Sequence, residues 1–155
     1  MQIVYGKLSD VPVGQMLELV NHPGIVAHMP FASPMDEATC SNWAAAKDAQ
    51  WQANGYGPWA IHVDGRFVGW GGFQREGDDV DLALVLLPEQ WGVGPAIIRD
   101  LIGLAWSRFG FASIICLLPP SRIRLKPLAR LGFVRDGSID WDGQTFLRFR
   151  MFNPG

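Results

Sequence analysis

The sequence predicts an α+β fold in which helices flank a mixed and mostly antiparallel central sheet. Three observations lead to this prediction. Short apolar runs alternate with amphipathic segments along the chain. Turn pairs such as Asp-Gly join several of these runs directly, which indicates antiparallel hairpins. One apolar run instead leads into a helical segment and then into another apolar run, which indicates a single parallel crossover.

Composition limits the size and class of the protein. Its 155 residues are 48% hydrophobic and 18% charged, which suits one domain over residues 1–155. A formal net charge of −2 argues against a general affinity for nucleic acid. Cys40 and Cys116 fit reduced thiols better than a disulfide framework. The sequence has no signal-peptide pattern and no apolar run long enough for a bilayer, so we expect a cytoplasmic protein that binds no membrane. We also expect that it binds no nucleic acid and is a monomer or homodimer.

The first third of the chain predicts one strand and two helices. Weak alternation over residues 2–8 predicts the strand, and apolar residues at helical spacing over 11–20 predict the first helix. The second helix is expected over about 33–53. Ser33 can cap that helix, and Pro34 suits its first turn, where acidic residues follow.

A β-hairpin is the firmest local prediction. The apolar runs 59–63 and 67–73 are separated by Asp64-Gly65, a pair that readily adopts the positive φ angles of a tight turn. A third antiparallel run, 80–87, is continuous enough in apolar residues to be a buried central strand.

The last third predicts the crossover and a closing hairpin. An apolar stripe over 95–109 predicts an amphipathic helix, and 111–118 predicts a buried strand beside it. Residues 121–131 predict a short helix. Two closing strands are expected on either side of Asp142-Gly143.

The stretch from Leu86 to Ala96 lies where the central strand turns into the crossover helix. Unpaired amides and the positive dipole end make a helix N-terminus an anion site, and Gly92 and Gly94 let a phosphate approach the backbone. The alternative is an ordinary turn that needs glycine for its backbone dihedrals, and an isolated Gly-x-Gly favours that alternative. The stretch lacks the third glycine of the dinucleotide fingerprint and the lysine of a P-loop.

This stretch resembles the coenzyme A-binding motif of the GNAT N-acetyltransferase superfamily, Gln/Arg-x-x-Gly-x-Gly/Ala. Trp91, Gly94 and Ala96 stand at its three defined positions. A Pro-Glu pair before Trp-Gly-x-Gly-x-Ala is closest in pattern to the branch with the ribosomal-protein N-terminal acetyltransferases. Arg-Leu-Gly-Phe at 130–133 and the predicted hairpin also resemble the family, so the resemblance spans about 58–152. It implies a GNAT-like sheet with a coenzyme A-binding strand-turn-helix.

The resemblance implies an N-acyltransferase that uses acetyl-coenzyme A, or another short acyl-coenzyme A, as its donor cosubstrate. The acceptor would be a primary amine of a small molecule or a peptide N-terminus, which attacks the thioester directly while an amide near Leu86 polarises the carbonyl. The coenzyme A-binding residues that it implies are Leu86, Leu87, Trp91, Gly92, Val93, Gly94, Ala96, Ser121 and Arg124.

Two departures from the family pattern leave a second function open. Pro95 has no amide to offer a phosphate. Leu128 stands where the family often has a tyrosine that acts as a proton donor. A non-catalytic acyl-coenzyme A-binding or regulatory module is therefore the alternative. Basic residues near the last short helix can hold the phosphates of coenzyme A or form an ordinary solvated face.

Asp81 is the leading candidate for the base that deprotonates the acceptor. It falls where the resembled branch often has a strand carboxylate, and alternation places it on one strand face with Asp79. The alternative is that both acids are solvated strand-end residues; Glu89 and His62 are weaker candidates for the base. We expect no metal site, because no histidine has a Cys, Asp or Glu at ligand spacing. The acceptor is expected to contact His28, Phe31 and Trp141.

Overall fold

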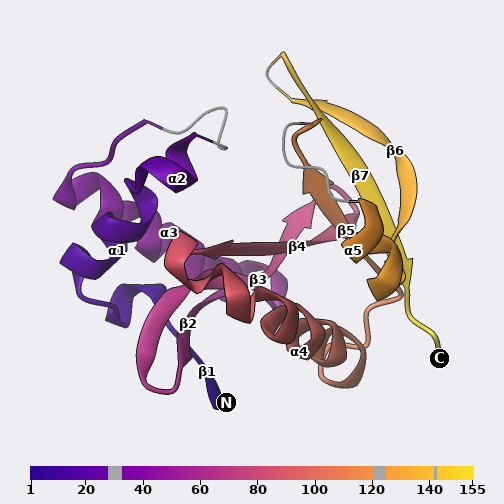
Figure 1. Ribbon diagram of the computed structural model, residues 1–155, viewed down its shortest axis with the longest axis horizontal. Coiled ribbons are helices and arrows are strands. Elements are labelled where there is room, and N and C mark those ends of the chain that lie inside the picture. Colours follow the sequence, from indigo (N-terminus) through magenta and orange to yellow (C-terminus); the bar gives the residue numbers. More distant parts are fainter. Residues whose placement is uncertain (28–32, 121–124, 142) are drawn as a thin grey trace.

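The computed structural model describes residues 1–27, 33–120, 125–141 and 143–155. A seven-stranded sheet forms its centre, with strand order β1-β2-β3-β4-β5-β7-β6 (Figure 1). Among the strand pairs of the described residues, only β4–β5 is parallel. The elements in chain order are β1 (Ile3–Gly6), α1 (Val13–Val20), α2 (Pro23–Val26), α3 (Glu37–Asn54), β2 (Pro58–Val63), β3 (Arg66–Glu76), β4 (Asp79–Leu86), α4 (Gly94–Ser107), β5 (Ser113–Leu118), α5 (Leu125–Leu131), β6 (Val134–Trp141) and β7 (Gln144–Phe152), with short 3-10 helices at Leu8–Asp10 and Pro88–Val93.

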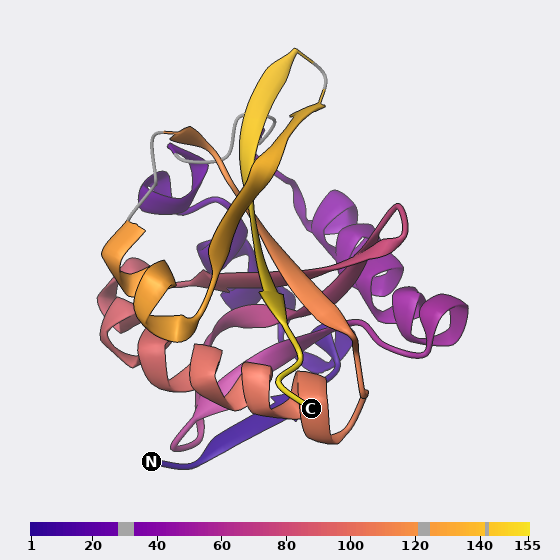
Figure 2. The ribbon, with the colours of Figure 1, turned by 90° about the vertical axis from the view of Figure 1, so that its right-hand side faces the viewer.

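Helices cover both faces of the sheet. On one face, α4 packs Ile97 and Leu101 against Leu82 and Leu86 of β4, and α5 lies beside α4 (Figure 2). On the other face, α1 and α3 form a second apolar cluster with β2 and β3. Successive β4 side chains therefore point to opposite layers, as expected for a strand. The predicted α+β class and the β4–α4–β5 crossover are both confirmed.

The predicted Asp-Gly hairpin is confirmed. Asp64 and Gly65 have φ angles of 50° and 81°, which join β2 to β3 through a turn with two positive φ values. Register shifts between Ile61 and His62, so β2 contains an irregularity near this turn. The closing strands β6 and β7 are also found, although Asp142 of their turn lies outside the described residues.

The prediction for the start of α3 is wrong. The helix begins at Glu37 and not near Ser33, and Asp36 is its N-cap, accepting a hydrogen bond from the Thr39 amide at 2.7 Å. The side chain of Asn21 bonds both the N–H and the C=O of Met35, each at 2.8 Å. This contact between distant segments holds the chain before the helix in place.

Three short helices were not predicted, namely α2 and the 3-10 helices Leu8–Asp10 and Pro88–Val93. His22 caps α2 by accepting a hydrogen bond from the Gly24 amide at 3.0 Å. The 3-10 helix Pro88–Val93 leads directly into α4. Cys40 and Cys116 are free thiols. None of the helices in the described ranges is long and apolar enough to cross a membrane.

Candidate active site

The site begins where β4 and β5 separate. Their parallel pairing is limited to Asp81 and Ile115. A longer parallel ladder would have used the N–H of Leu117 to bond the backbone of β4. Here the Leu117 N–H instead donates to the Asp81 carboxylate. Asp81 therefore stands at the point where the two strands begin to diverge.

Beyond that point, alternate amides of β4 face the gap between the strands. Leu87 N–H donates to Val68 of β3 at 2.9 Å, and Leu86 is paired in register with Gly69. Antiparallel geometry then directs the amides of Leu86 and Leu84 away from β3, towards β5. The sequence predicted Leu86 for this role and did not identify Leu84. Leu84 is about 10 Å along the strand from Asp81 and Leu86 about 17 Å.

The Asp81 carboxylate is partly buried, and its pKa is raised from 3.8 to about 7. Burial is the main cause, because it disfavours the charged form, and repulsion from Glu76 adds to it. The charge of Lys47 and the Leu117 amide oppose the shift. Asp81 is therefore partly ionised at neutral pH, as a general base requires.

Lys47 of α3 supplies a positive charge close to Asp81. Its Nζ donates to Gln74 Oε1 of β3 at 2.5 Å, and Gln50 Nε2 donates to the same oxygen at 3.2 Å. The ammonium group also lies 4.6 Å from the ring centre of Trp70. Burial lowers the Lys47 pKa from 10.5 to about 8, although attraction to Asp81 opposes that change.

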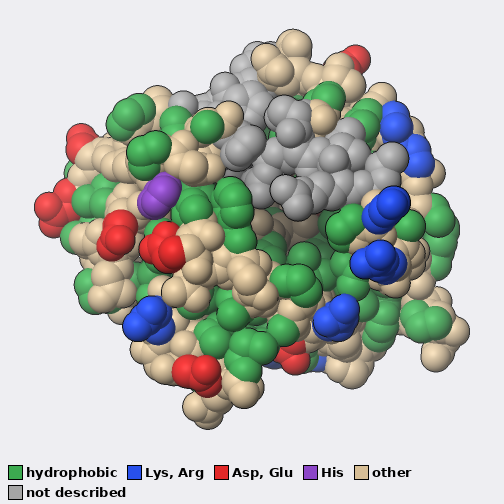
Figure 3. Space-filling model, in the orientation of Figure 1, with side chains coloured by type: hydrophobic (Ala, Val, Ile, Leu, Met, Phe, Trp, Pro, Cys, Tyr) green, Lys and Arg blue, Asp and Glu red, His purple; other side chains and the backbone are tan. Residues whose placement is uncertain are grey.

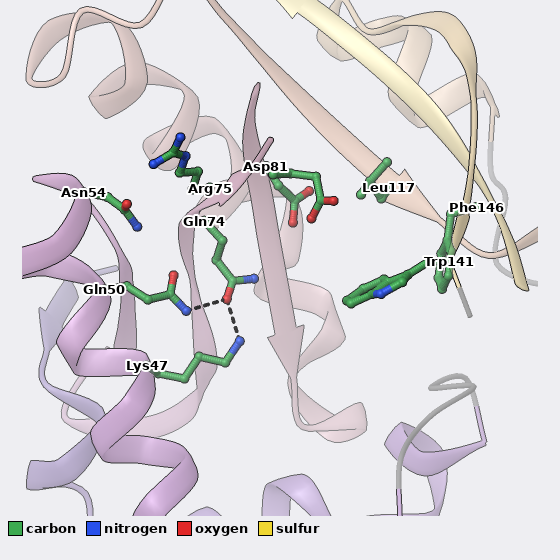
Figure 4. Close-up of a pocket in the computed structure, with 10 residues that line it drawn as sticks. Lys47, Gln50, Asn54, Gln74, Arg75, Asp81, Leu117, Trp141 and Phe146 are labelled. Atoms are coloured by element: carbon green, nitrogen blue, oxygen red, sulfur yellow. Dashed lines mark hydrogen bonds between the residues drawn. The ribbon is translucent and has the colours of Figure 1, made fainter. Parts of the chain in front are cut away.

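One cavity of about 460 Å³ is lined by these polar groups, without Trp70, and by the polar residues Asn54, Arg75 and Glu76 (Figure 4). Helix α3 forms one wall, with Lys47 and Gln50, and the central strands carry Gln74 and Asp81. The opposite wall is apolar. Its residues are Leu117 of β5 and the aromatic pair of the β6–β7 hairpin, Trp141 and Phe146.

The structure thus brings Trp141 and Asp81, two residues that the sequence singled out, to the same cavity. The Trp141 side chain is 57% exposed, and its ring centre is 6.2 Å from that of Phe146. His28 and Phe31, also predicted to contact the acceptor, lie outside the described residues. Lys47, Gln50 and Gln74 were not identified from the sequence, because only the packing of α3 against β3 brings them together.

The glycine turn has a different geometry from an ordinary glycine-dependent turn. Neither Gly92 nor Gly94 has a positive φ. A Cβ atom at Gly92 would meet nothing within 4 Å, and one at Gly94 would meet only Leu86 Cδ1 at 3.6 Å. These backbone positions thus tolerate a side chain, which weakens the alternative that glycine is present for its dihedrals.

Trp91 ties this turn to the end of β4. Its indole N–H donates to the Leu86 carbonyl at 3.0 Å, and the ring remains 45% exposed. Val93 precedes the first residue of α4 and provides no side-chain cap, and Pro95 has no amide. The Ala96 amide in the first turn of α4 therefore marks a positive helix end that a phosphate can approach.

Basic side chains lie on the same side of the molecule as α4 and α5. Arg99, Lys126 and Arg130 are exposed, and Figure 3 shows Lys and Arg side chains gathered towards that side, with acidic side chains mostly opposite. Ser121 and Arg124, predicted to bind coenzyme A, lie outside the described residues. Leu128 packs against the apolar cluster of α4, so α5 has no hydroxyl at that position.

The weaker candidates are not part of the cavity. His62 lies against Phe67 near the hairpin turn, with the two rings tilted and their centres 5.6 Å apart, and Glu89 is exposed in the turn before α4. Burial, aided by the charge of Asp81, raises the pKa of the Cys116 thiol, which keeps it un-ionised. Among the residues that the structure describes, no group of three His, Cys, Asp or Glu side chains could hold a metal ion.

The chain is similar to known acetyltransferases in sequence pattern and in fold. The family model described as an acetyltransferase (GNAT) domain matches residues 7–132. An acetyltransferase from Agrobacterium tumefaciens is similar in structure with a TM-score of 0.76 and 16% identity, covering 97% of this chain and 91% of that one. A GNAT-family acetyltransferase from Bacillus anthracis is similar with a TM-score of 0.76 and 12% identity, covering 98% of this chain and 95% of that one. The aminoglycoside acetyltransferase AAC(6')-Ib, in complex with coenzyme A and kanamycin, is similar with a TM-score of 0.73 and 14% identity, covering 98% of this chain and 94% of that one.

Proposed function

Because this chain belongs to the GNAT acetyltransferase family, we propose that it transfers an acetyl or other short acyl group from acyl-coenzyme A to a primary amine. The observation that carries this proposal is the position of Asp81. A carboxylate with a pKa of about 7 lines a cavity at the point where β4 and β5 separate. A carboxylate with that pKa suits proton removal from an amine at neutral pH.

The proposed reaction is a direct attack. The acceptor amine enters the cavity and passes a proton to Asp81, directly or through a water molecule. The nitrogen bonds to the acyl carbon while the carbon–sulfur bond breaks, and coenzyme A leaves as a thiolate that water protonates. An amide of β4 that faces the gap, Leu84 or Leu86, stabilises the negative charge on the carbonyl oxygen. If the Leu84 amide binds the carbonyl oxygen, the shorter distance along the strand lets the amine pass its proton directly to Asp81. If the Leu86 amide binds it, a water molecule must relay the proton.

The positive end of α4 is the proposed phosphate site. Its residues are Trp91, Gly92, Val93, Gly94 and Ala96, with Leu87 completing the turn. Support comes from the glycines, which leave space at the backbone, and from a structural neighbour that binds coenzyme A. Ser121 and Arg124 remain proposals from the family resemblance. So does the placement within the branch of ribosomal-protein N-terminal acetyltransferases.

The acceptor is proposed to lie against Trp141, with His28 and Phe31 as further contacts. We also propose a cytoplasmic protein that acts as one domain, as a monomer or homodimer, and that binds no nucleic acid or membrane. The net charge of −2 and the low count of two cysteines in the sequence support this view.

The test is release of free coenzyme A from acetyl-coenzyme A in the presence of an amine panel. Asp81→Asn should lower kcat about a hundredfold or more while acetyl-coenzyme A affinity stays near that of wild type. Asp78→Asn is the matched control, since Asp78 is exposed and lies outside the cavity. A protein that coenzyme A stabilises against heat but that acetylates no amine would instead be the non-catalytic binding module. Equal turnover in the two variants would remove Asp81 from the mechanism.

A further inference from the structure

Lys47 lies on the cavity wall, near enough to Asp81 to be attracted to it but without a direct ion pair among the described residues. The ion pairs among the described residues involve Arg148 and Arg150, and none involves Lys47. Within the part of the chain that the structure describes, its Nζ makes one hydrogen bond, to Gln74 Oε1, although an ammonium group has three protons to donate. Two donors of Lys47 therefore remain for a bound molecule.

The neighbouring groups hold the ammonium in place and leave it charged. Gln74 Oε1 is shared between Lys47 and Gln50, so the Gln74 side chain is fixed by α3. Ring centres of Trp43 and Trp70 lie 5.7 Å and 4.6 Å from Nζ, within the range of a cation–π contact. No hydrogen bond within the described ranges engages Gln74 Nε2, which adds a further donor beside Lys47.

The cavity thus offers different chemistry to the two ends of a small molecule. Asp81 provides a proton acceptor beside the separating strands, and Lys47 with Gln74 provides donors on the α3 side (Figure 4). Leu117, Trp141 and Phe146 add apolar surface on the opposite side, and the polar side chains of Asn54, Arg75 and Glu76 complete the lining. Charge and hydrogen-bonding capacity therefore match a molecule with an amine, an anionic group and an apolar part.

We propose that the acceptor is an amino acid or a related small molecule with a carboxylate close to its reacting amine, and that Lys47 binds this carboxylate. The inference rests on the proposed acetyl transfer, whose acceptor it specifies. A polyamine or a polycationic sugar lacks the anion that Lys47 requires, and it would place a second cation near the ammonium group. Such an acceptor therefore loses affinity through like-charge repulsion.

The experiment compares amino acids with their own carboxamides as acceptors of acetyl-coenzyme A. Each pair differs only in the anionic group. The carboxamide has the more easily deprotonated amine, so a preference for the amino acid must come from recognition of its carboxylate. For the best pair we expect kcat/KM to favour the carboxylate by about tenfold or more, since hydrogen bonds to charged groups are strong.

Variants then assign the preference to Lys47. Lys47→Met keeps most of the side-chain length and removes the charge, and it should bring the ratio of the two kcat/KM values close to one. Lys47→Arg should keep part of the preference. Lys7→Met makes the same substitution at an exposed lysine outside the cavity and should leave the ratio unchanged. A wild-type protein that favours no amino acid over its carboxamide overturns the inference, whether or not the variants fold, and so does an unchanged ratio in a folded Lys47→Met.

A binding measurement separates this inference from the proposed function. N-acetyl amino acids and their carboxamides are the products of the two reactions, and their binding in the presence of coenzyme A can be measured by thermal stabilisation. If no amine is acetylated, the proposed function fails. The inference about Lys47 then stands only if wild type still binds the carboxylate form more tightly and Lys47→Met does not.

Discussion

Replacing Asp81 by Asn should stabilise the protein while it impairs catalysis. The carboxylate has an ordinary pKa of 3.8 and a folded-state pKa of about 7. Between these two values the folded protein keeps a proton that the unfolded chain releases. Wild-type stability therefore falls as pH rises through this window and stays constant above it.

The size of the effect follows from the pKa difference. About three pKa units correspond to roughly 4 kcal/mol of unfolding free energy, which is an upper estimate because the nearby Lys47 is coupled to Asp81. Asn is close in shape and uncharged, and its amide oxygen can still accept from Leu117 N–H. The gain in stability for Asp81→Asn should thus be near zero at pH 4 and largest at pH 8.

Urea denaturation at a series of pH values between 4 and 8 measures this difference, with Asp78→Asn as the control. The expected result is a gap between Asp81→Asn and wild type that widens with pH, together with no widening for the control. A gap that does not change with pH, or a variant less stable than wild type at pH 8, would show that the Asp81 carboxylate is not held at a raised pKa.

Further substitutions probe the phosphate site, the acceptor wall and the start of α3. Gly92→Glu should weaken coenzyme A binding about tenfold or more by placing a negative charge at the positive end of α4. Gly103→Glu, on the exposed side of α4, should leave the affinity unchanged. Equal coenzyme A affinities of the two variants by calorimetry would reject the phosphate site. Trp141→Ala should raise the acceptor KM several-fold with little change for acetyl-coenzyme A, and a change in the donor KM alone would place Trp141 elsewhere. Asp36→Ala should lower the thermal midpoint because it removes the cap of α3, while Asp36→Asn should retain most of the stability. The capping hydrogen bond lowers the pKa of the Asp36 carboxyl. Its stabilisation is therefore present above the ordinary pKa and is lost as pH falls through the lowered folded-state pKa.

The parts of the fold that the sequence predicted correctly depend on local signals. Asp64-Gly65 specifies a tight turn through its own backbone preferences. The apolar stripe of α4 and the continuous apolar run of β4 likewise reflect periodicity within single segments. The start of α3 was missed because Ser33 and Asp36 are both suitable caps in the sequence, and the bonds from the more distant Asn21 that hold Met35 before the helix cannot be seen there.

The same distinction applies to the candidate site. Asp81 could be proposed because the family resemblance pointed to its strand position, whereas alternation alone placed Asp79 on the same face. Lys47 belongs to a helix with little apolar periodicity, and its role appears only when α3 packs beside Gln74 of β3. Leu84 could have been found by counting alternate residues back from Leu86, but the separation of β4 from β5 had to be seen first.

The most direct test of the central claim is the pH dependence of kcat/KM for acetyl transfer, with one acceptor whose amine titrates well above neutral pH. Wild type and Asp78→Asn should both show activity that rises through an apparent pKa of about 7, because Asp81 must be ionised to accept a proton. Asp81→Asn should lose that step and keep only the slope due to the acceptor amine. If the step near pH 7 persists in a folded Asp81→Asn, another group is the base.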